Sequence, residues 1–365
     1  MTTLFDTFPL GRITLSNRLV MNPMTRSRAD VDGKVSQLTA TYYGERASAG
    51  LLVTEGIAPS PNGKGYARIP GLWSAEQVEA WAPVTKAVHD AQGHIFAQLM
   101  HTGRVSHIAN MTAGAKVVAP SALTLEGQMW TDGQGQQPHS APEALDAAGI
   151  EQAKSEFVNA AKNAIAAGFD GVELHGANGY LIEQFLSPVT NQRSDRYGGS
   201  VDNRVRFLVE VATEVAAAIG GDRLALRISP YGKNGGMSEY PEIDETYLTL
   251  AKALAPLGLA YLHVADHFGQ SFGGPGAHPQ LEALKAKLRQ AWRPLAFLVG
   301  GSFDKDSAAR ALAEGKVDLV GFGRAFLANP DLVRRFRDEL ALNAPDPSTF
   351  FTPGAKGYTD YPRAP

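Results

Sequence analysis

Residues 150–174, IEQAKSEFVNAAKNAIAAGFDGVEL, read as a helix that leads into a short buried strand. The helical part carries apolar side chains at the spacing that places them on one face, namely Ile150, Ala153, Phe157, Ala161 and Ile165. Gly168 follows at the position where a helix commonly ends in a left-handed conformation. Because the run 171–174 then reads as a strand, the stretch predicts one unit of an α/β fold.

The same unit recurs on both sides of this stretch. Strands are expected at 19–24, 50–58, 95–99, 171–174, 224–228, 260–264, 295–299 and 318–322. A second helix, expected to end at Gly220, has an apolar face formed by Val205, Leu208, Ala212, Val215 and Ile219. Eight such units predict a single (β/α)8 TIM barrel over residues 1–365, because they take up the chain and leave no segment for a second domain. An open, doubly wound sheet is the alternative architecture.

Two segments fall outside the repeated units. Residues 100–145, approximately, are polar, contain glycine and proline, and include the turn signal Asp132-Gly133-Gln134-Gly135. We expect this insertion after the third strand to form a lid or hairpin over the barrel mouth. The tail at 343–365 is proline-rich, and we expect it to be loop-like.

The composition excludes several classes of protein. Lys and Arg number 34 against 37 Asp and Glu, a net charge of −3 without a basic stripe, so we expect no nucleic-acid partner. The chain has no cysteine, which excludes disulfides, iron–sulfur clusters, thiolate-bound zinc and a catalytic thiol. The nine histidines show no metal-binding spacing, so we expect no metal.

The start of the chain bears on where the protein works. The first six residues lack the basic segment and apolar run of a signal peptide. No stretch approaches the roughly 20 apolar residues that a membrane helix needs. We therefore expect a cytoplasmic protein with no membrane partner, and the sequence leaves the oligomeric state open between monomer and dimer.

Polar groups gather where the predicted strands end, which is where TIM barrels carry their chemistry. The positions are Pro23, Met24, Thr25 and Arg26 after the first strand, Ala58 closing the second, Gln98 and His101 about the third, His175, Asn178 and Tyr180 after the fourth, Arg227 ending the fifth, Gly301 and Ser302 after the seventh, and Gly323 and Arg324 after the eighth. Packing alone explains such convergence poorly.

The glycine-rich turns after the last two strands match the place where barrels commonly bind a phosphate through backbone N–H groups. Arg324 would add a fixed positive charge there. The alternative is that these glycines only make tight turns and that Arg324 forms a surface ion pair.

The residues after the fourth strand can donate hydrogen bonds and a proton. His175 and Asn178 can polarise a carbonyl group, and Tyr180 stays protonated at neutral pH and can act as a general acid. The alternative is a loop in which Asn178 satisfies turn geometry and His175 caps a backbone group. Arg227 stands in an apolar strand, so it needs an anion or an electron-rich ring as its partner.

Several motifs resemble the signature of the Old Yellow Enzyme family. They are LHGANGYL at 174–181, QFLSP at 184–188, NQRSDRYGGS at 191–200, NRVRF at 203–207 and GRAFLANPDL at 323–332, with Leu10-Gly11 and Asn17-Arg18 near the start. The resemblance covers essentially the whole chain and implies a noncovalently bound FMN. NADPH or NADH would reduce this FMN, and an activated alkene such as an enone, a maleimide or a nitro compound would reoxidise it.

The resemblance also implies roles for individual residues. The FMN phosphate would lie on Gly301, Ser302, Gly323 and Arg324, and the ring would meet Pro23, Met24, Thr25, Ala58, Gln98 and Arg227. A hydride would pass from the nicotinamide to flavin N5 and then to the β-carbon of the alkene. His175 and Asn178 would bind the substrate carbonyl oxygen, and Tyr180 would protonate the α-carbon from the opposite face.

Three further residues are expected to face the substrate: Tyr66, Met100 and Tyr358. Met100 departs from the family pattern, because many relatives carry Trp there, and its flexible thioether should enlarge that wall of the pocket. Two other functions compete with the ene-reductase. A lyase or isomerase acting on a phosphorylated substrate would need a base or Schiff-base lysine, which no strand end supplies. A catalytically inactive barrel that only binds ligands or partners is the other alternative. Such a protein would have no physical need for the set His175, Asn178, Tyr180 and Arg227.

Overall fold

The barrel strands form a closed ring in a computed structural model that describes residues 2–365. In ring order the strands are β10 (Gly171–Gly176), β11 (Leu224–Ile228), β12 (Tyr261–Ala265), β13 (Ala296–Gly300), β14 (Leu319–Phe322), β3 (Leu19–Met21), β4 (Leu51–Ile57) and β5 (Ile95–Leu99). Neighbouring strands are parallel throughout. The TIM barrel is therefore confirmed. The open sheet is wrong, because β14 pairs with β3 and leaves no edge.

Successive residues of each strand point to opposite sides of the barrel wall, as the two-residue period of a strand requires. Val20 and Val53 belong to an interior cluster, whereas Leu19 and Leu52 belong to a larger cluster shared with the surrounding helices. The hairpin of β1 (Phe8–Leu10) and β2 (Ile13–Leu15) contributes to the interior cluster. This hairpin therefore closes one end of the barrel, and the open end is left for a ligand.

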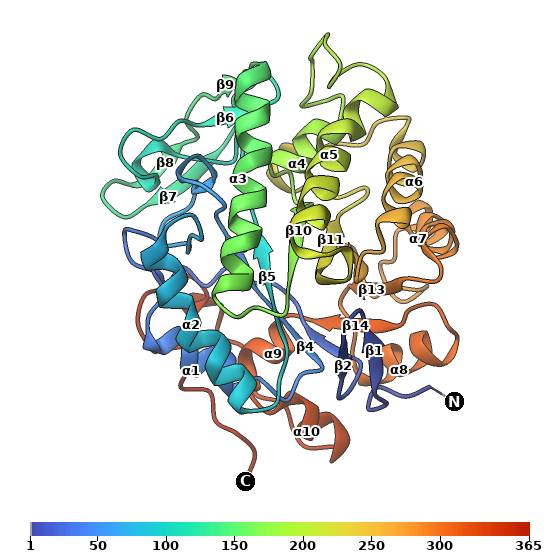
Figure 1. Cartoon of the computed structure of the whole chain (residues 1–365). Coiled ribbons are helices and arrows are strands. Elements are labelled where there is room, and N and C mark those ends of the chain that lie inside the picture. Colours follow the sequence, from blue (N-terminus) through green and yellow to red (C-terminus); the bar gives the residue numbers. More distant parts are fainter. Residues whose placement is uncertain (1) are drawn as a thin grey trace.

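Helices surround the barrel in Figure 1. They are α1 (Gln37–Glu45), α2 (Ala75–Asp90), α3 (Ala147–Ala166), α4 (Leu181–Leu186), α5 (Val201–Ile219), α6 (Ile243–Leu254), α7 (Pro279–Trp292), α8 (Lys305–Ala313), α9 (Arg324–Ala328) and α10 (Leu332–Arg337). The two helices whose apolar faces were identified in the sequence are α3 and α5. Asp146 caps the start of α3 by accepting from Gly149 N–H. Gly168 and Gly220 follow the two helices with φ values of 92° and 94°, which other residues rarely adopt.

The insertion after β5 contains two small sheets. Strands β6 (Val118–Ala119) and β9 (Glu143–Ala144) pair in parallel, and β7 (Gln128–Thr131) and β8 (Gly135–Pro138) form an antiparallel hairpin. Figure 1 shows this hairpin at the upper left of the molecule. Asn110 ties it to the loop after β4, because its Nδ2 atom donates to Gly65 O at 3.1 Å and to Trp130 O at 2.9 Å.

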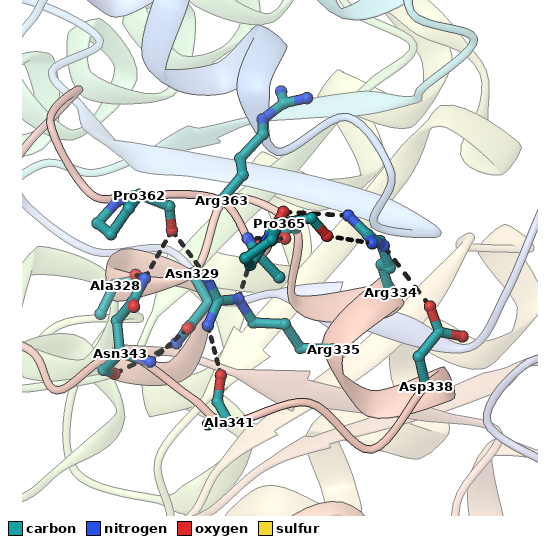
Figure 2. Close-up of polar contacts among 12 residues, drawn as sticks. Ala328, Asn329, Arg334, Arg335, Asp338, Ala341, Asn343, Pro362, Arg363 and Pro365 are labelled. Carbon is teal, nitrogen blue, oxygen red and sulfur yellow. Dashed lines mark hydrogen bonds and ion pairs between the residues drawn. The ribbon is translucent and has the colours of Figure 1, made fainter.

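The tail after α10 has little regular structure, apart from a short 3-10 helix at Pro347–Thr349. Figure 2 shows how side chains fasten it to the body of the molecule. Asn343 donates through Nδ2 to Ala328 O and Pro362 O, both at 2.8 Å. Arg334 donates to Pro365 O at 2.6 Å, and Arg335 donates to Ala341 O and Pro362 O. The tail is therefore held by side chains that donate hydrogen bonds to backbone carbonyl oxygens, because it has little secondary structure to hold it.

Replacing Arg28 by methionine is expected to loosen the tail. Its guanidinium donates to Gly354 O at 2.9 Å, Thr349 O at 3.0 Å and Lys356 O at 2.8 Å. Hydrogen bonds from a charged donor contribute about 1.5–3 kcal/mol, so trypsin should cleave after Lys356 at least about tenfold faster. Mass spectrometry of the digest measures the rate, with Arg310→Met on the exposed face of α8 as the control. Equal rates in the two variants would contradict this anchoring role.

Candidate active site

A cavity of about 960 Å³ opens at the carboxyl ends of the barrel strands. The barrel contributes Pro23, Met24, Thr25, Gly56, Gln98, Met100, His175, Asn178, Tyr180, Arg227, His267 and Arg324. The loop after β4 contributes Tyr66, Ala67 and Arg68, and the β7–β8 hairpin contributes Trp130 and Gln136 among others. The tail adds Phe350 and Phe351. Barrel, insertion and tail thus build one cavity together.

Four predicted cofactor residues do not line this cavity. Ala58 is buried beside Ile69 and Met100, behind the cavity wall. Gly301 and Ser302 lie directly after β13, and a Cβ on Gly301 would approach Ser271 Oγ to 2.2 Å. Gly323 precedes α9 in open surroundings, since a Cβ there would come no closer than 3.6 Å to Met24 Sδ. Phosphate binding at these glycines stays a prediction, with Arg324 beside them at the cavity.

Tyr358 does not line the cavity, so the prediction that it contacts the substrate is wrong. Its side chain is 0% exposed and stacks on Tyr42 with ring centroids 4.1 Å apart. The guanidinium of Arg28 lies 4.5 Å from its ring centre. Tyr358 therefore anchors the tail, and the aromatic residues that the tail contributes to the cavity are Phe350 and Phe351, the second of which is 59% exposed.

The sequence reasoning missed several cavity residues. His267 follows β12, so the rule that strand ends carry the chemistry could have found it. Trp130 could have been found less surely, because a large apolar side chain in a polar insertion indicates a contact with a ligand or with the core. Arg68 and Phe351 carried no signal, because only the folded chain brings them together: Arg68 donates to Phe351 O at 2.9 Å and pairs with Asp132.

His175 and Tyr180 lie against each other on the cavity wall. Their ring centroids are 4.8 Å apart, and the Tyr180 hydroxyl donates to the Tyr66 hydroxyl at 3.2 Å. Burial raises the pKa of Tyr180 above its usual value, so the phenol keeps its proton at neutral pH. Burial and the charge of Arg227 hold the pKa of His175 well below 6.5, so this ring is neutral. Since His175 Nδ1 accepts from Ala177 N–H at 3.3 Å, its proton lies on Nε2.

A buried carboxyl group holds the loop that carries Asn178. Glu183 accepts from Gly179 N–H at 2.6 Å and from the Ser229 hydroxyl at 2.9 Å, and burial raises its pKa to about 7. The Ser229 oxygen accepts in turn from Asn178 N–H at 2.8 Å. Asn178 itself has a φ of 60°, a left-handed conformation that asparagine tolerates better than most residues. Glu183 and Ser229 therefore fix the backbone of the loop at Asn178 and Gly179.

A second buried carboxylate lies inside the barrel. Glu173 accepts from Gln98 Nε2 at 2.7 Å, and its other oxygen lies 2.9 Å from His263 Nδ1. Burial acts to raise the pKa of Glu173, but His263, Arg227 and Gln98 together hold it below 4.5. The amide nitrogen of Gln98 donates to Glu173. The carbonyl oxygen of Gln98 is therefore the end of the side chain that remains to contact a ligand in the cavity. Within residues 2–365, the buried Nε of Arg227 has no hydrogen-bond partner.

Residues 3–343 match the model of a family described as NADH:flavin oxidoreductase / NADH oxidase. A solved structure, the old yellow enzyme homologue from Zymomonas mobilis, is 40% identical to this chain, covers 99% of it over 99% of its own length, and has a TM-score of 0.93. The chain belongs to the Old Yellow Enzyme family. Its predicted family membership is thus confirmed.

Two further relatives agree with this membership. A probable flavin mononucleotide-dependent alkene reductase of Leishmania infantum is 40% identical over 358 residues, which are 97% of this chain and 95% of that protein. The structure of morphinone reductase in complex with tetrahydroNAD is 40% identical, with a TM-score of 0.93 over 100% of this chain and 98% of that one. The chain is accordingly an oxidoreductase, and a lyase or isomerase is not favoured.

The cavity fits the FMN that this Old Yellow Enzyme family member requires. Its volume of about 960 Å³ accommodates a large ligand. The unpartnered Nε of Arg227 supplies a charged donor, Gln98 supplies an acceptor, and Arg324 supplies a second positive charge on the wall. A flavin ring with carbonyl and N–H groups and a phosphate would satisfy all three. In the part of the chain that the structure describes, no group of three or more His, Asp or Glu side chains is placed to bind a metal.

No helix between residues 2 and 365 combines the length and the apolar character that crossing a membrane takes. This finding bears on the helices alone.

Proposed function

We propose that this chain reduces the C=C bond of α,β-unsaturated carbonyl compounds and related activated alkenes, with FMN in the cavity and NADPH or NADH as the reductant. The observation that carries the proposal is the set of groups on one wall of the cavity: the neutral imidazole of His175, the carboxamide of Asn178 and the protonated phenol of Tyr180. Two of these can polarise a carbonyl group, and the third can release a proton.

The residues around the FMN would hold and tune it. Thr25, Gln98 and Arg227 would contact the ring, with Pro23 and Met24 along it, and Gly301, Ser302, Gly323 and Arg324 would bind the phosphate. A bound FMN would supply the redox chemistry, namely the relay of a hydride from the reduced nicotinamide to the β-carbon of the alkene. The positive charge of Arg227 favours the extra negative charge that a reduced ring carries.

His175 and Asn178 bind and polarise the substrate. The Nε2–H group of His175 and the amide N–H of Asn178 donate to the carbonyl oxygen, which draws electron density away from the β-carbon. Because burial keeps His175 neutral, it polarises the carbonyl without giving up a proton. The two donors also fix which face of the alkene meets the ring.

Tyr180 completes the reduction. Its hydroxyl gives a proton to the α-carbon, and the resulting phenolate regains a proton from water. Tyr66 lies 3.2 Å from this hydroxyl and holds it in place. Because hydride and proton arrive from opposite faces, the addition across the double bond is trans.

The other residues that line the cavity indicate which kind of substrate fits it. Met100, Tyr66, Trp130 and Phe351 present apolar surface around the carbonyl-binding pair. Such a lining suits a small apolar body joined to one strong acceptor group, as in an enone, a maleimide or a nitroalkene. We infer that residues 1–365 work as a single FMN-binding domain. The cytoplasmic location stays a prediction.

The test is an absorbance spectrum of the purified protein. We expect flavin bands near about 450 nm that bleach when NADPH is added without oxygen and return when 2-cyclohexenone follows. Bands that bleach and stay bleached with enone would contradict alkene reduction. A colourless protein that FMN cannot reconstitute would contradict the cofactor.

A further inference from the structure

His267 contacts the side chain of Asn178 on the cavity wall. It follows β12 by two residues, and its Nε2 atom lies 2.5 Å from Asn178 Oδ1. His267 also lines the cavity, although the mechanism above assigns it no part. We propose that His267 is a positioning residue, which orients the Asn178 carboxamide so that its N–H group faces the substrate carbonyl. This inference rests on the proposed ene-reductase function.

The direction of the carboxamide decides whether Asn178 can act. Its two ends differ, because the oxygen only accepts hydrogen bonds and the nitrogen only donates them. With the oxygen held by His267, the nitrogen is the end that remains for the cavity. The reverse orientation would place the amide oxygen against the substrate oxygen, and two acceptors repel each other. One hydrogen bond from His267 therefore selects the productive orientation.

The side-chain torsion is the freedom that Asn178 has left. Its backbone is held by the Ser229 hydroxyl at 2.8 Å and has a left-handed φ of 60°. Rotation about the bond to the carboxamide still exchanges oxygen and nitrogen at little cost. Asn178 Oδ1 can only accept, so the contact at 2.5 Å requires the His267 proton on Nε2. In that tautomer His267 removes the rotational freedom, because the Asn178 nitrogen cannot accept a hydrogen bond.

The loop that carries His267 is itself anchored. Asp266 accepts from Lys285 Nζ at 2.8 Å and from the Ser271 hydroxyl at 2.6 Å, and the side chains of Lys285 and Asp266 are both fully buried. Asp266 also accepts from Phe268 N–H at 3.1 Å, so it brackets His267 on both sides. Burial, followed by the charge of Arg227, lowers the pKa of His267 to about 4, so the ring donates as a neutral imidazole.

The experiment is a double-mutant cycle on the FMN-loaded protein. His267→Leu removes the donor, His267→Gln replaces it with an amide N–H, and each is combined with Asn178→Ala. The dissociation constant of 2-cyclohexenone is measured on the oxidised enzyme from the perturbed flavin absorbance, together with KM and kcat. His89→Leu on α2, outside the cavity lining, is the matched control.

We expect His267→Leu to weaken enone binding and raise KM by about tenfold, the size of one well-placed hydrogen bond. His267→Gln should recover most of this loss. In the Asn178→Ala background, His267→Leu should have no further effect, because the residue it positions is gone. FMN content and the spectrum of the free enzyme should not change.

Either of two results would overturn the positioning role. One is unchanged enone binding in His267→Leu. The other is an equal loss with and without Asn178, which would mean that His267 acts through the shape of the cavity. A wild-type holoenzyme that neither binds nor reduces the enone would overturn the proposed function, and the inference with it, and so is distinct from both.

Discussion

Replacing Tyr180 by phenylalanine is expected to slow alkene reduction by about 10²- to 10⁴-fold, the range that a positioned proton donor contributes. The change removes the hydroxyl and keeps the ring, so the packing against His175 at 4.8 Å survives. Flavin reduction by NADPH transfers no proton from this phenol and should stay near the wild-type rate. Stopped-flow absorbance measures the two half-reactions separately.

Tyr66→Phe is the matched control, since it removes a phenol hydroxyl from the same cavity. The Tyr66 hydroxyl only accepts from Tyr180 at 3.2 Å, so its loss should slow alkene reduction by less than about tenfold. Equal effects of the two substitutions would point to a shared change in cavity polarity. An unchanged alkene half-reaction in Tyr180→Phe would remove the phenol from the mechanism.

The barrel was predictable because its signal is local and repeated. Each strand is a short buried run, and helices such as α3 carry their apolar residues on one face, so a few residues at a time suffice. The position of the site followed from the barrel, since strand ends converge at one mouth. His175, Asn178 and Tyr180 lie at that mouth in the structure.

The tail was harder to predict, because its partners lie far along the chain. Tyr358 stacks on Tyr42, and Arg28 holds carbonyl groups more than 320 residues away. The tail has no regular period, so the sequence does not distinguish a buried aromatic side chain from one that faces a ligand. Tyr358, which was expected to face the substrate, is therefore an anchor, and Phe351, for which the sequence predicted no role, lines the cavity.

The buried carboxylate of Glu173 shows a related limit. The run 171–174 reads as an ordinary strand, and the residues that make its one charge tolerable are Gln98 and His263, 75 and 90 residues away. Strand register explains the arrangement. Glu173 pairs with Ala225, which belongs to the interior cluster, and Arg227 lies two residues further on the same face. A carboxylate and a guanidinium thus share the barrel interior.

Replacing Glu173 by glutamine is accordingly expected to destabilise the fold. The direct partners of Glu173 are Gln98 and His263, and its charge is also the first of those that favour the protonated form of the buried Arg227. Replacing the carboxylate takes a charged hydrogen-bond acceptor from buried donors and leaves Arg227 less compensated, at a cost of about 1–3 kcal/mol. Urea unfolding at pH 7 measures the loss, with Glu79→Gln on the exposed face of α2 as the control. A Glu173→Gln variant as stable as the control would contradict this electrostatic role of Glu173.

The pH dependence separates this explanation from a loss of packing. The pKa of Glu173 lies below 4.5 in the folded protein, so its ionised form stabilises the fold. That contribution is fully present above the ordinary value of 4.5 for a glutamate, and it is lost as the pH falls through the lower folded value. The stability difference between wild type and Glu173→Gln should therefore be constant from pH 8 to pH 6 and shrink below about pH 4.5. A difference that persists at low pH would mean that shape and hydrogen bonding, rather than charge, give Glu173 its role beside Arg227.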